Sequence, residues 1–372
     1  MEIRDKRIAI LSPVAWRTPP RAYGAWETVA GNIAEGLVAR GWRNVTLFAT
    51  SDSVTKARLV SFIDRGYEED KSQIGPVSTC LHICKTLEHA GEFDLIHNNF
   101  DYLPLTYLPF ITTPMLTTIH GFSHPDILRV YRNFKDTYYV SISDADRDRE
   151  LPYVATVYNG IDLSNLTFRD RGGDKLVFLG RIHMDKGTHL AIDVAKRCGR
   201  DLLISGIIQD QPYFDTFVRP HLNDSSIRYL GPADPAQRDE LFRQAYATLH
   251  LNTIPERFGL VMAESMAAGV PVIAMDLGSC REVIKDKETG FLVNTVDEAV
   301  EAVGRVEQID RKACRRRVEE NFSISRMTER YEAVYEEIFR REAAKDARGI
   351  TQGVPCTPIP ANAFMGPHTD SS

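Results

Sequence analysis

The chain has 372 residues, of which 43% are hydrophobic and 26% charged, a composition typical of a globular protein with one large or two ordinary domains. Its net charge of -6 argues against a general nucleic-acid-binding protein. No apolar run approaches the roughly 18 residues that a membrane-spanning helix needs, and the charged N-terminal segment does not fit a secretory signal.

The first half alternates short β-branched runs with helix-length amphipathic stretches, which predicts parallel strands joined by helices. Strands are expected at 7–11, 45–49, 94–97, 115–119, 138–142 and 154–158. The clearest helix spans 25–40, and Gly41 is a natural stop after it. One face of this helix carries an apolar stripe of Trp26, Val29, Ile33 and Leu37.

The second half repeats this pattern, with strands expected at 175–180, 201–205, 227–231, 247–251, 271–275 and 290–293. Asn-Gly and Gly-Gly steps mark 158–175 as a linker. We therefore expect an α/β protein of two Rossmann-like, doubly wound parallel-sheet domains that face each other across a cleft. Ligands in such sheets bind outside the carboxyl ends of the strands.

Four units are expected along the chain. An N-terminal domain takes 1–165, a C-terminal domain 166–326 and a terminal amphipathic helix 327–347. The tail, 348–372, is rich in Pro and small polar residues, a composition that predicts disorder.

The segment 252–275, NTIPERFGLVMAESMAAGVPVIAM, places two glutamates at a strand-to-helix junction. Glu256 is expected in the loop and Glu264 in the second turn of the helix. A helix start presents free N–H groups to a phosphate, and Gly259 allows a ligand to approach the backbone. The alternative is that Glu256 caps the helix and Glu264 is a solvated surface charge.

The stretch PERFGLVMAESMAAGVPVIAMDLGSCREVI resembles the signature of family-4 (group 1) retaining glycosyltransferases of the GT-B fold. Four further segments agree with that family in order: PPRAYGAWETVAGNIAEGLVARGW near the start, TIHG at 118–121, VYNGID at 157–162 and FLGRIHMDKGTHLAID at 178–193. The resemblance implies an N-terminal acceptor domain and a C-terminal nucleotide-sugar domain. It also implies that the terminal helix crosses back to the N-terminal domain.

The resemblance implies that the two glutamates hold the donor. Glu256 would lie near the transferred sugar, and Glu264 would bind the ribose hydroxyls. Phosphate or sugar oxygens would meet the backbone amides of Phe258, Gly259, Leu260 and Val261.

Arg181 and Lys186 match the basic pair that binds the diphosphate in that family. Two cations at this position stabilise the leaving group as it gains negative charge, so no divalent metal is expected. Without the resemblance, two exposed charges beside a glycine turn would be the ordinary interpretation.

Single residues in three loops complete the predicted site. Gly24 lies between strand and helix, although the family's second glycine is an alanine here. His120 matches a family histidine near the sugar, with a structural hydrogen-bonded histidine as the alternative. His97 is expected to be structural, since Asn99 replaces the second His of the family's His-x-His. Gly206 lies in the strand-end loop 205–210, where the family packs the nucleobase.

Three further segments contain charged residues whose roles can be predicted. The run SDADRDRE at 143–150 is expected to be the polar start of a helix and not a metal site. Gly278 is expected to shape the sugar pocket, and Glu282 either belongs to a helix or packs between domains. The basic run 311–317 is expected on a solvated helix face, with contact to an anionic membrane as the alternative.

We therefore expect a retaining, metal-independent hexosyltransferase that uses a UDP- or GDP-sugar as substrate and no cofactor. Its partners would be the nucleotide sugar and a saccharide, lipid-linked or small-molecule acceptor, and no nucleic acid. Six scattered cysteines without a CxxC motif predict reduced thiols and a cytoplasmic location.

Other functions fit less well. A glycoside hydrolase also uses two carboxylates, but the anion-binding setting disfavours it. A nicotinamide dehydrogenase would need GxGxxG after the first strand, which is missing there. A sugar-nucleotide epimerase of the same fold and a catalytically silent relative stay as alternatives.

Overall fold

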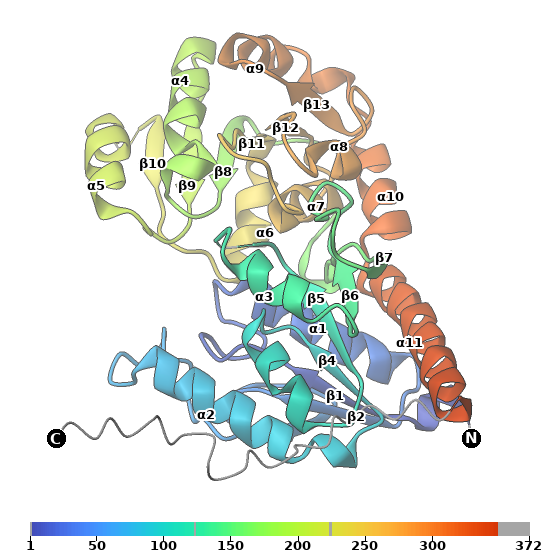
Figure 1. The fold of residues 1–372 in the computed structure, drawn as a ribbon. Coiled ribbons are helices and arrows are strands. Elements are labelled where there is room, and N and C mark those ends of the chain that lie inside the picture. Colours follow the sequence, from blue (N-terminus) through green and yellow to red (C-terminus); the bar gives the residue numbers. More distant parts are fainter. Residues whose placement is uncertain (1, 123, 223–224, 349–372) are drawn as a thin grey trace, which may run out of the picture.

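The computed structural model describes residues 2–122, 124–222 and 225–348. Figure 1 shows two α/β domains one above the other, with the long helix α11 (Ile324–Ala347) running beside the N-terminal one. Both sheets are parallel, so the predicted fold of two Rossmann-like domains is confirmed. The boundaries 165/166 and 326/327 stay predictions. Apart from Arg348, the tail predicted to be disordered lies outside the described residues.

The N-terminal sheet has the strand order β3-β2-β1-β4-β5-β6-β7. Its strands are β1 (Arg7–Leu11), β2 (Asn44–Phe48), β3 (Arg58–Val60), β4 (Leu95–Asn98), β5 (Met115–Ile119), β6 (Tyr138–Ser141) and β7 (Tyr153–Thr156). The helices are α1 (Ala25–Ala39), α2 (Gly75–Glu88) and α3 (Ile127–Asn133). The edge strand β3 was not predicted, because three half-exposed residues give too short an apolar pattern.

The C-terminal sheet has the order β10-β9-β8-β11-β12-β13. Its strands are β8 (Lys175–Leu179), β9 (Leu202–Ser205), β10 (Ile227–Tyr229), β11 (Ala245–His250), β12 (Val272–Met275) and β13 (Gly290–Val293). The helices are α4 (Thr188–Cys198), α5 (Gln211–Tyr213), α6 (Pro235–Arg243), α7 (Leu260–Ala267), α8 (Cys280–Val283), α9 (Val296–Val303) and α10 (Arg311–Asn321).

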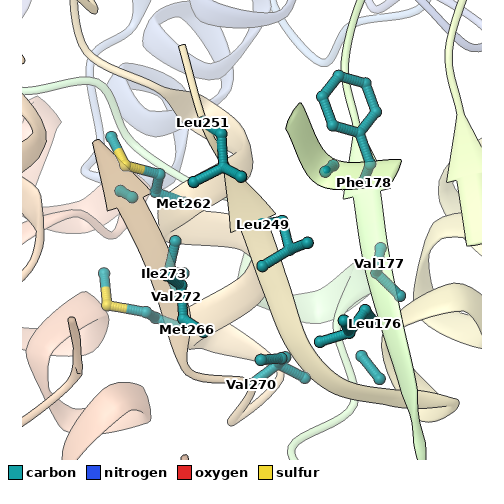
Figure 2. Close-up of a cluster of buried hydrophobic side chains, with 14 of the residues drawn as sticks. Leu176, Val177, Phe178, Leu249, Leu251, Met262, Met266, Val270, Val272 and Ile273 are labelled. Carbon is teal, nitrogen blue, oxygen red and sulfur yellow. The ribbon is translucent and has the colours of Figure 1, made fainter. Parts of the chain in front are cut away.

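The core of the C-terminal domain holds the loops of the site in place. Figure 2 shows Leu249 of β11 between Val177 of β8 on one side and Met262 and Met266 of α7 on the other. All four side chains are at most 1% exposed. Since strands of a parallel sheet are covered on both faces, they appear in the sequence as continuous apolar runs. Helix α7 is thereby fixed against β11, with its first turn at the carboxyl edge of the sheet.

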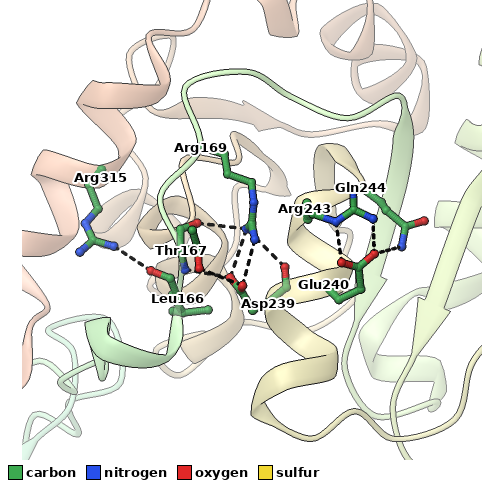
Figure 3. Close-up of polar contacts among 8 residues, drawn as sticks. All are labelled: Leu166, Thr167, Arg169, Asp239, Glu240, Arg243, Gln244 and Arg315. Atoms are coloured by element: carbon green, nitrogen blue, oxygen red, sulfur yellow. Dashed lines mark hydrogen bonds and ion pairs between the residues drawn. The ribbon is translucent and has the colours of Figure 1, made fainter.

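The linker 158–175 is bound to the C-terminal domain. Arg169 pairs with Asp239 of α6 at 2.9 Å, and Thr167 bonds the same carboxylate through its backbone nitrogen at 2.8 Å (Figure 3). Arg315 of α10 donates to the carbonyl oxygen of Leu166 at 3.2 Å. These bonds fix the end of the linker before β8 begins.

Helix α11 packs on the N-terminal domain against α1. Tyr331 and Tyr335 are fully buried, and their hydroxyls lie 2.8 Å from Thr118 Oγ1 and 2.7 Å from His97 Nδ1. Gly36 of α1 permits the close crossing, because a Cβ there would lie 2.0 Å from an oxygen of Thr328. A helix that follows the C-terminal domain therefore completes the core of the N-terminal one.

Candidate active site

A cavity of about 480 Å³ lies between the two domains. It is placed where each sheet reverses its strand order, between β1 and β4 in one domain and between β8 and β11 in the other, which is the usual ligand position in doubly wound sheets. Gly206 and Gly278, both predicted near the site, do not line this cavity. The other predicted site residues do: Gly24, His120, Arg181, Lys186, Glu256, Phe258, Gly259, Leu260, Val261 and Glu264.

Glu256 lies in the loop after β11, and its side chain is only 9% exposed. Its Oε2 accepts hydrogen bonds from Lys186 Nζ at 2.6 Å and from Asn252 Nδ2 at 2.6 Å. His250 Nε2 lies 2.9 Å from the same oxygen. Burial opposes ionisation, but the His250 hydrogen bond and the Lys186 charge outweigh it, and the pKa of Glu256 lies well below its usual range. A carboxylate so strongly held as the anion is poorly suited to act as a general acid.

Glu264 projects from the second turn of α7, and its side chain is 15% exposed. Arg238 Nη1 of α6 donates to its Oε1 at 2.7 Å. Burial raises the pKa of Glu264, and the Arg238 charge partly offsets the rise. The alternative of a solvated surface charge is therefore wrong for Glu264.

Arg238 also lines the cavity and was not predicted as a site residue. The Asp-Pro-Ala-Gln run before it forms a capping box at the start of α6, with Asp234 and Gln237 bonded reciprocally. That pattern was available in the sequence and fixes the helix start. The partner of Arg238 was not available there, since Glu264 is distant in sequence.

Helix α7 begins without a side-chain cap, since its N-cap is Gly259 with φ 82°. A backbone in the left-handed region favours glycine. The predicted amides of Phe258, Gly259, Leu260 and Val261 thus belong to an uncapped helix start on the wall of the cavity.

Arg181 lies two residues after the end of β8 and donates a hydrogen bond to Gln209 in the loop after β9. Gly206, predicted near the nucleobase, does not line the cavity. A Cβ on Gly206 would lie 1.7 Å from the carbonyl oxygen of Gly180. The observed role of Gly206 is therefore to let the two loops run side by side, which places Gln209 against Arg181.

His120 ends β5 on the opposite wall of the cavity and is 8% exposed. Its ring stacks on Trp26 at 5.5 Å between centroids, and its Nε2 lies 3.2 Å from Asn99 Oδ1. Burial lowers the pKa of His120 to about 3, so the imidazole is neutral at physiological pH. His97 bonds Tyr335 and Thr118 within the core, a structural position.

Trp26 belongs to the apolar stripe predicted on α1, but its environment differs from that of Ile33 and Leu37. Val29, Ile33 and Leu37 are buried as expected, but Trp26 is half-buried and lines the cavity. A helical period places Trp26 on the correct face of α1, but it does not tell whether that face meets the core or a ligand at the helix start.

Residues 167–322, which span the C-terminal domain, match the model of the family described as glycosyl transferases group 1. The C-terminal domain of this chain thus carries the sequence pattern of group 1 glycosyl transferases. Phosphatidyl-myo-inositol mannosyltransferase of Mycobacterium leprae is 28% identical over 326 residues, which cover 79% of this chain and 84% of that relative. The resemblance seen in the sequence is thereby confirmed.

Solved structures agree in fold with this chain. Sucrose-phosphate synthase from Thermosynechococcus elongatus superposes with a TM-score of 0.74 at 18% identity, covering 90% of this chain and 100% of that one. The Anabaena protein HepE in complex with UDP and glucose superposes with a TM-score of 0.68 at 18% identity, covering 89% and 100%. At such identities the likeness extends to the fold, which is GT-B.

Two charged segments of the chain differ from expectation. The run 143–150 forms turns and no helix, so the expected helix start is wrong. Its residues instead bond the C-terminal domain: Asp146 pairs with Arg257 at 2.5 Å, and Glu282 accepts from the backbone nitrogens of Asp144 and Ala145 at 2.8 Å each. Glu282 lies in helix α8 and also packs between the domains, so both roles considered for it are observed.

The basic run 311–317 forms most of α10, and a fully solvated face is wrong for three of its arginines. Arg311, Arg315 and Arg317 donate to backbone carbonyl oxygens of the C-terminal domain, at 2.8 Å to Tyr246, 2.9 Å to Ala267 and 2.7 Å to Glu282. Only Lys312 and Arg316 of the described run are exposed as expected. The three arginines thus provide hydrogen-bond donors for these backbone carbonyl groups.

Across residues 2–122, 124–222 and 225–348, no cluster of three or more His, Cys, Asp or Glu side chains could hold a metal ion. In the same ranges every helix is too short or too polar to cross a membrane. Five cysteines there are free thiols, while the sixth, Cys356, lies outside the described residues: Cys80, Cys84, Cys198, Cys280 and Cys314.

Proposed function

We propose that this glycosyl transferase moves a hexosyl group, with retention of configuration, from a UDP- or GDP-sugar to an acceptor hydroxyl. One observation carries the proposal: two buried carboxylates, Glu256 and Glu264, flank an uncapped helix start in a cavity that also holds Arg181 and Lys186. A helix N-terminus and two cations suit a diphosphate, and carboxylates suit hydroxyl groups.

The donor is proposed to lie along the C-terminal wall. Glu264 binds the ribose hydroxyls, with Arg238 holding the carboxylate in place at 2.7 Å. Glu256 faces the transferred sugar, and the α7 amides meet the phosphates. The bound UDP of HepE supports a uridine nucleotide as the first donor to try.

Arg181 and Lys186 are proposed to supply the main electrostatic catalysis. As the glycosidic bond breaks, the β-phosphate gains negative charge, and two preplaced cations stabilise that state more than the ground state. Lys186 also bonds Glu256, so one cation links the sugar and the phosphate ends of the donor. A divalent metal and a cofactor are not needed in this scheme.

Retention is proposed to follow front-face attack, in which the departing phosphate accepts the proton of the acceptor hydroxyl. The neutral imidazole of His120 would then orient the sugar or the acceptor and would not carry positive charge to the reaction. The acceptor is a saccharide, a lipid-linked sugar or a small molecule. The mannosyltransferase relative, named for phosphatidyl-myo-inositol, supports a lipid-linked polyol. A cytoplasmic location stays a prediction.

The experiment has two steps. UDP, GDP and ADP are first compared by thermal shift, because a ligand of the folded state raises its melting temperature. The sugar nucleotides of the best base are then incubated with candidate acceptors, with and without EDTA, and the anomeric configuration of the product is read by NMR. Retained configuration and EDTA-resistant transfer support the proposal. Inverted product, conversion of donor without acceptor, or binding without turnover would favour an inverting enzyme, an epimerase or a silent relative.

A further inference from the structure

The loop that carries Glu256 also bridges the two domains. Arg257 donates from Nη1 to Asp146 Oδ1 at 2.5 Å and from Nη2 to the carbonyl oxygen of Phe122 at 3.3 Å. Ser143 Oγ donates to the carbonyl oxygen of Arg257 at 2.6 Å. One residue of the C-terminal domain therefore contacts two separate loops of the N-terminal domain.

Asp146 is the buried end of this bridge. Its side chain is 1% exposed, and its Oδ2 has no hydrogen-bond partner among the residues that the structure describes. Burial raises the pKa of Asp146 to about 6, against the lowering effect of Arg257. Because a buried carboxylate is costly without a counterion, the position of Arg257 matters to the whole 143–146 loop.

Glu282 of α8 makes a second contact with the same loop, because its carboxylate accepts hydrogen bonds from the backbone nitrogens of Asp144 and Ala145. The turn before α8 is itself bonded to Glu256, whose carbonyl oxygen accepts from the backbone nitrogen of Ser279 at 3.0 Å. Gly278 makes this contact possible, since a Cβ there would lie 2.3 Å from that oxygen. The two residues that contact the N-terminal loop, Arg257 and Glu282, therefore both belong to segments bonded to Glu256.

We call Arg257, Glu282 and the loop 143–146 the interdomain latch. We propose that Arg257 is a positioning residue that couples the placement of the N-terminal domain to the carboxylate of Glu256. The coupling is direct, because the backbone nitrogen of Arg257 donates to Glu256 Oε1 at 3.0 Å while its guanidinium holds Asp146. When the contacts of the latch form, the N-terminal domain and the carboxylate of Glu256 are held in a fixed relative position.

The kinetic test compares Arg257→Met, Arg257→Lys and the control Arg281→Met in the full chain. Arg281 pairs with Asp276 inside the C-terminal domain and is exposed. This test rests on the proposed function. We expect Arg257→Met to lower kcat about tenfold while the Kd for the nucleoside diphosphate stays within about twofold, since the latch orients the reaction more than it binds nucleotide. Lysine restores part of the turnover. Normal turnover of Arg257→Met, or equal losses in kcat and nucleotide binding, would overturn the proposal.

Hydrogen exchange tests the latch without catalysis. The amides of Asp144 and Ala145 bond Glu282 across the domains, so we expect them to exchange about tenfold faster in Arg257→Met, because local opening exposes them. The control Arg281→Met and wild type exchange alike. Unchanged exchange in Arg257→Met overturns the proposal, whereas a wild type that transfers no sugar contradicts the proposed function and leaves this test intact.

Discussion

The two walls of the cavity differ in chemistry. On the C-terminal wall, buried charges are paired: Lys186 with Glu256 at 2.6 Å and Arg238 with Glu264 at 2.7 Å. On the N-terminal wall, Trp26 stacks on a neutral His120. Among the described residues that line the cavity, none from the N-terminal domain is Asp, Glu, Lys or Arg.

This difference suggests how one cavity serves two substrates. A charged wall with fixed counterions suits an anionic nucleotide donor, because its electrostatics are set before the ligand arrives. An uncharged aromatic wall suits a ring with apolar faces, such as a sugar or a cyclic polyol. The difference supports the proposed binding of the donor at the C-terminal wall and of the acceptor at the N-terminal wall, a division that variants of each wall can test.

The largest effect is expected for Lys186→Ala. The change removes one cation from the leaving group and leaves Glu256 buried without its ion pair, so kcat should fall roughly 1,000-fold, as for loss of a preplaced electrostatic group. Steady-state transfer kinetics measure it. Lys196→Ala, a change at an exposed site on α4, is the matched control, and similar rates for the two variants would remove Lys186 from the mechanism.

The second-largest effect is expected for Glu264→Gln, which should weaken nucleotide binding. The amide keeps the shape of the side chain but loses the negative charge that pairs with Arg238. In the proposed complex the same carboxylate accepts hydrogen bonds from the ribose hydroxyls, so the Kd for the nucleotide should rise by about 10- to 100-fold. Calorimetric titration measures the change. Glu288→Gln, at an exposed position paired with Lys285, should bind as wild type does; equal losses in both variants would argue for a general charge effect.

Trp26→Ala should weaken the binding of the acceptor. Loss of the stacked ring should raise the KM for the acceptor about tenfold and leave nucleotide affinity unchanged, since aromatic contacts contribute roughly 0.5–1.5 kcal/mol beyond burial. Initial rates at saturating donor separate the two effects. Trp26→Phe should restore most of the loss, and a weaker nucleotide affinity in Trp26→Ala would break the division between the walls.

The smallest effect concerns pH. Burial raises the pKa of Glu264, so protonation should weaken nucleotide binding as pH falls through a value above 4.5. Arg238 lowers that pKa, so Arg238→Met should move the loss of binding to higher pH. Glu256 behaves in the opposite way, since its pKa lies well below 4.5, and should stay ionised throughout. Kd measured from pH 4.5 to 7.5 tests the direction; a shift to lower pH in Arg238→Met would contradict it.

Much of the fold was predictable because parallel strands are covered on both faces. Runs such as 115–119 and 290–293 were located as strands for this reason, and the structure has β5 and β13 there. The edge strand β3 was missed because it is short and half-exposed. Most of the site residues that the motifs predicted line one cavity, but Gly206 and Gly278 do not.

The sequence alone does not predict ion-pair and hydrogen-bond partners that come from distant segments of the chain. The pairs Arg238–Glu264 and Arg257–Asp146 join residues far apart in the chain, and no local pattern predicts them. The basic helix was misjudged for the same reason, because its arginines bond carbonyl groups of other elements. Periodicity placed Trp26 on the correct face but not in the cavity.

The division between the two walls is tested most directly by one titration series. UDP, GDP and ADP are titrated into wild type, Glu264→Gln and Trp26→Ala under identical conditions. We predict that at least one nucleoside diphosphate binds wild type, that Glu264→Gln weakens this binding about tenfold or more, and that Trp26→Ala leaves it unchanged. Equal loss in both variants, or no binding of any of the three nucleotides to wild type, would contradict the assignment of the donor to the C-terminal wall.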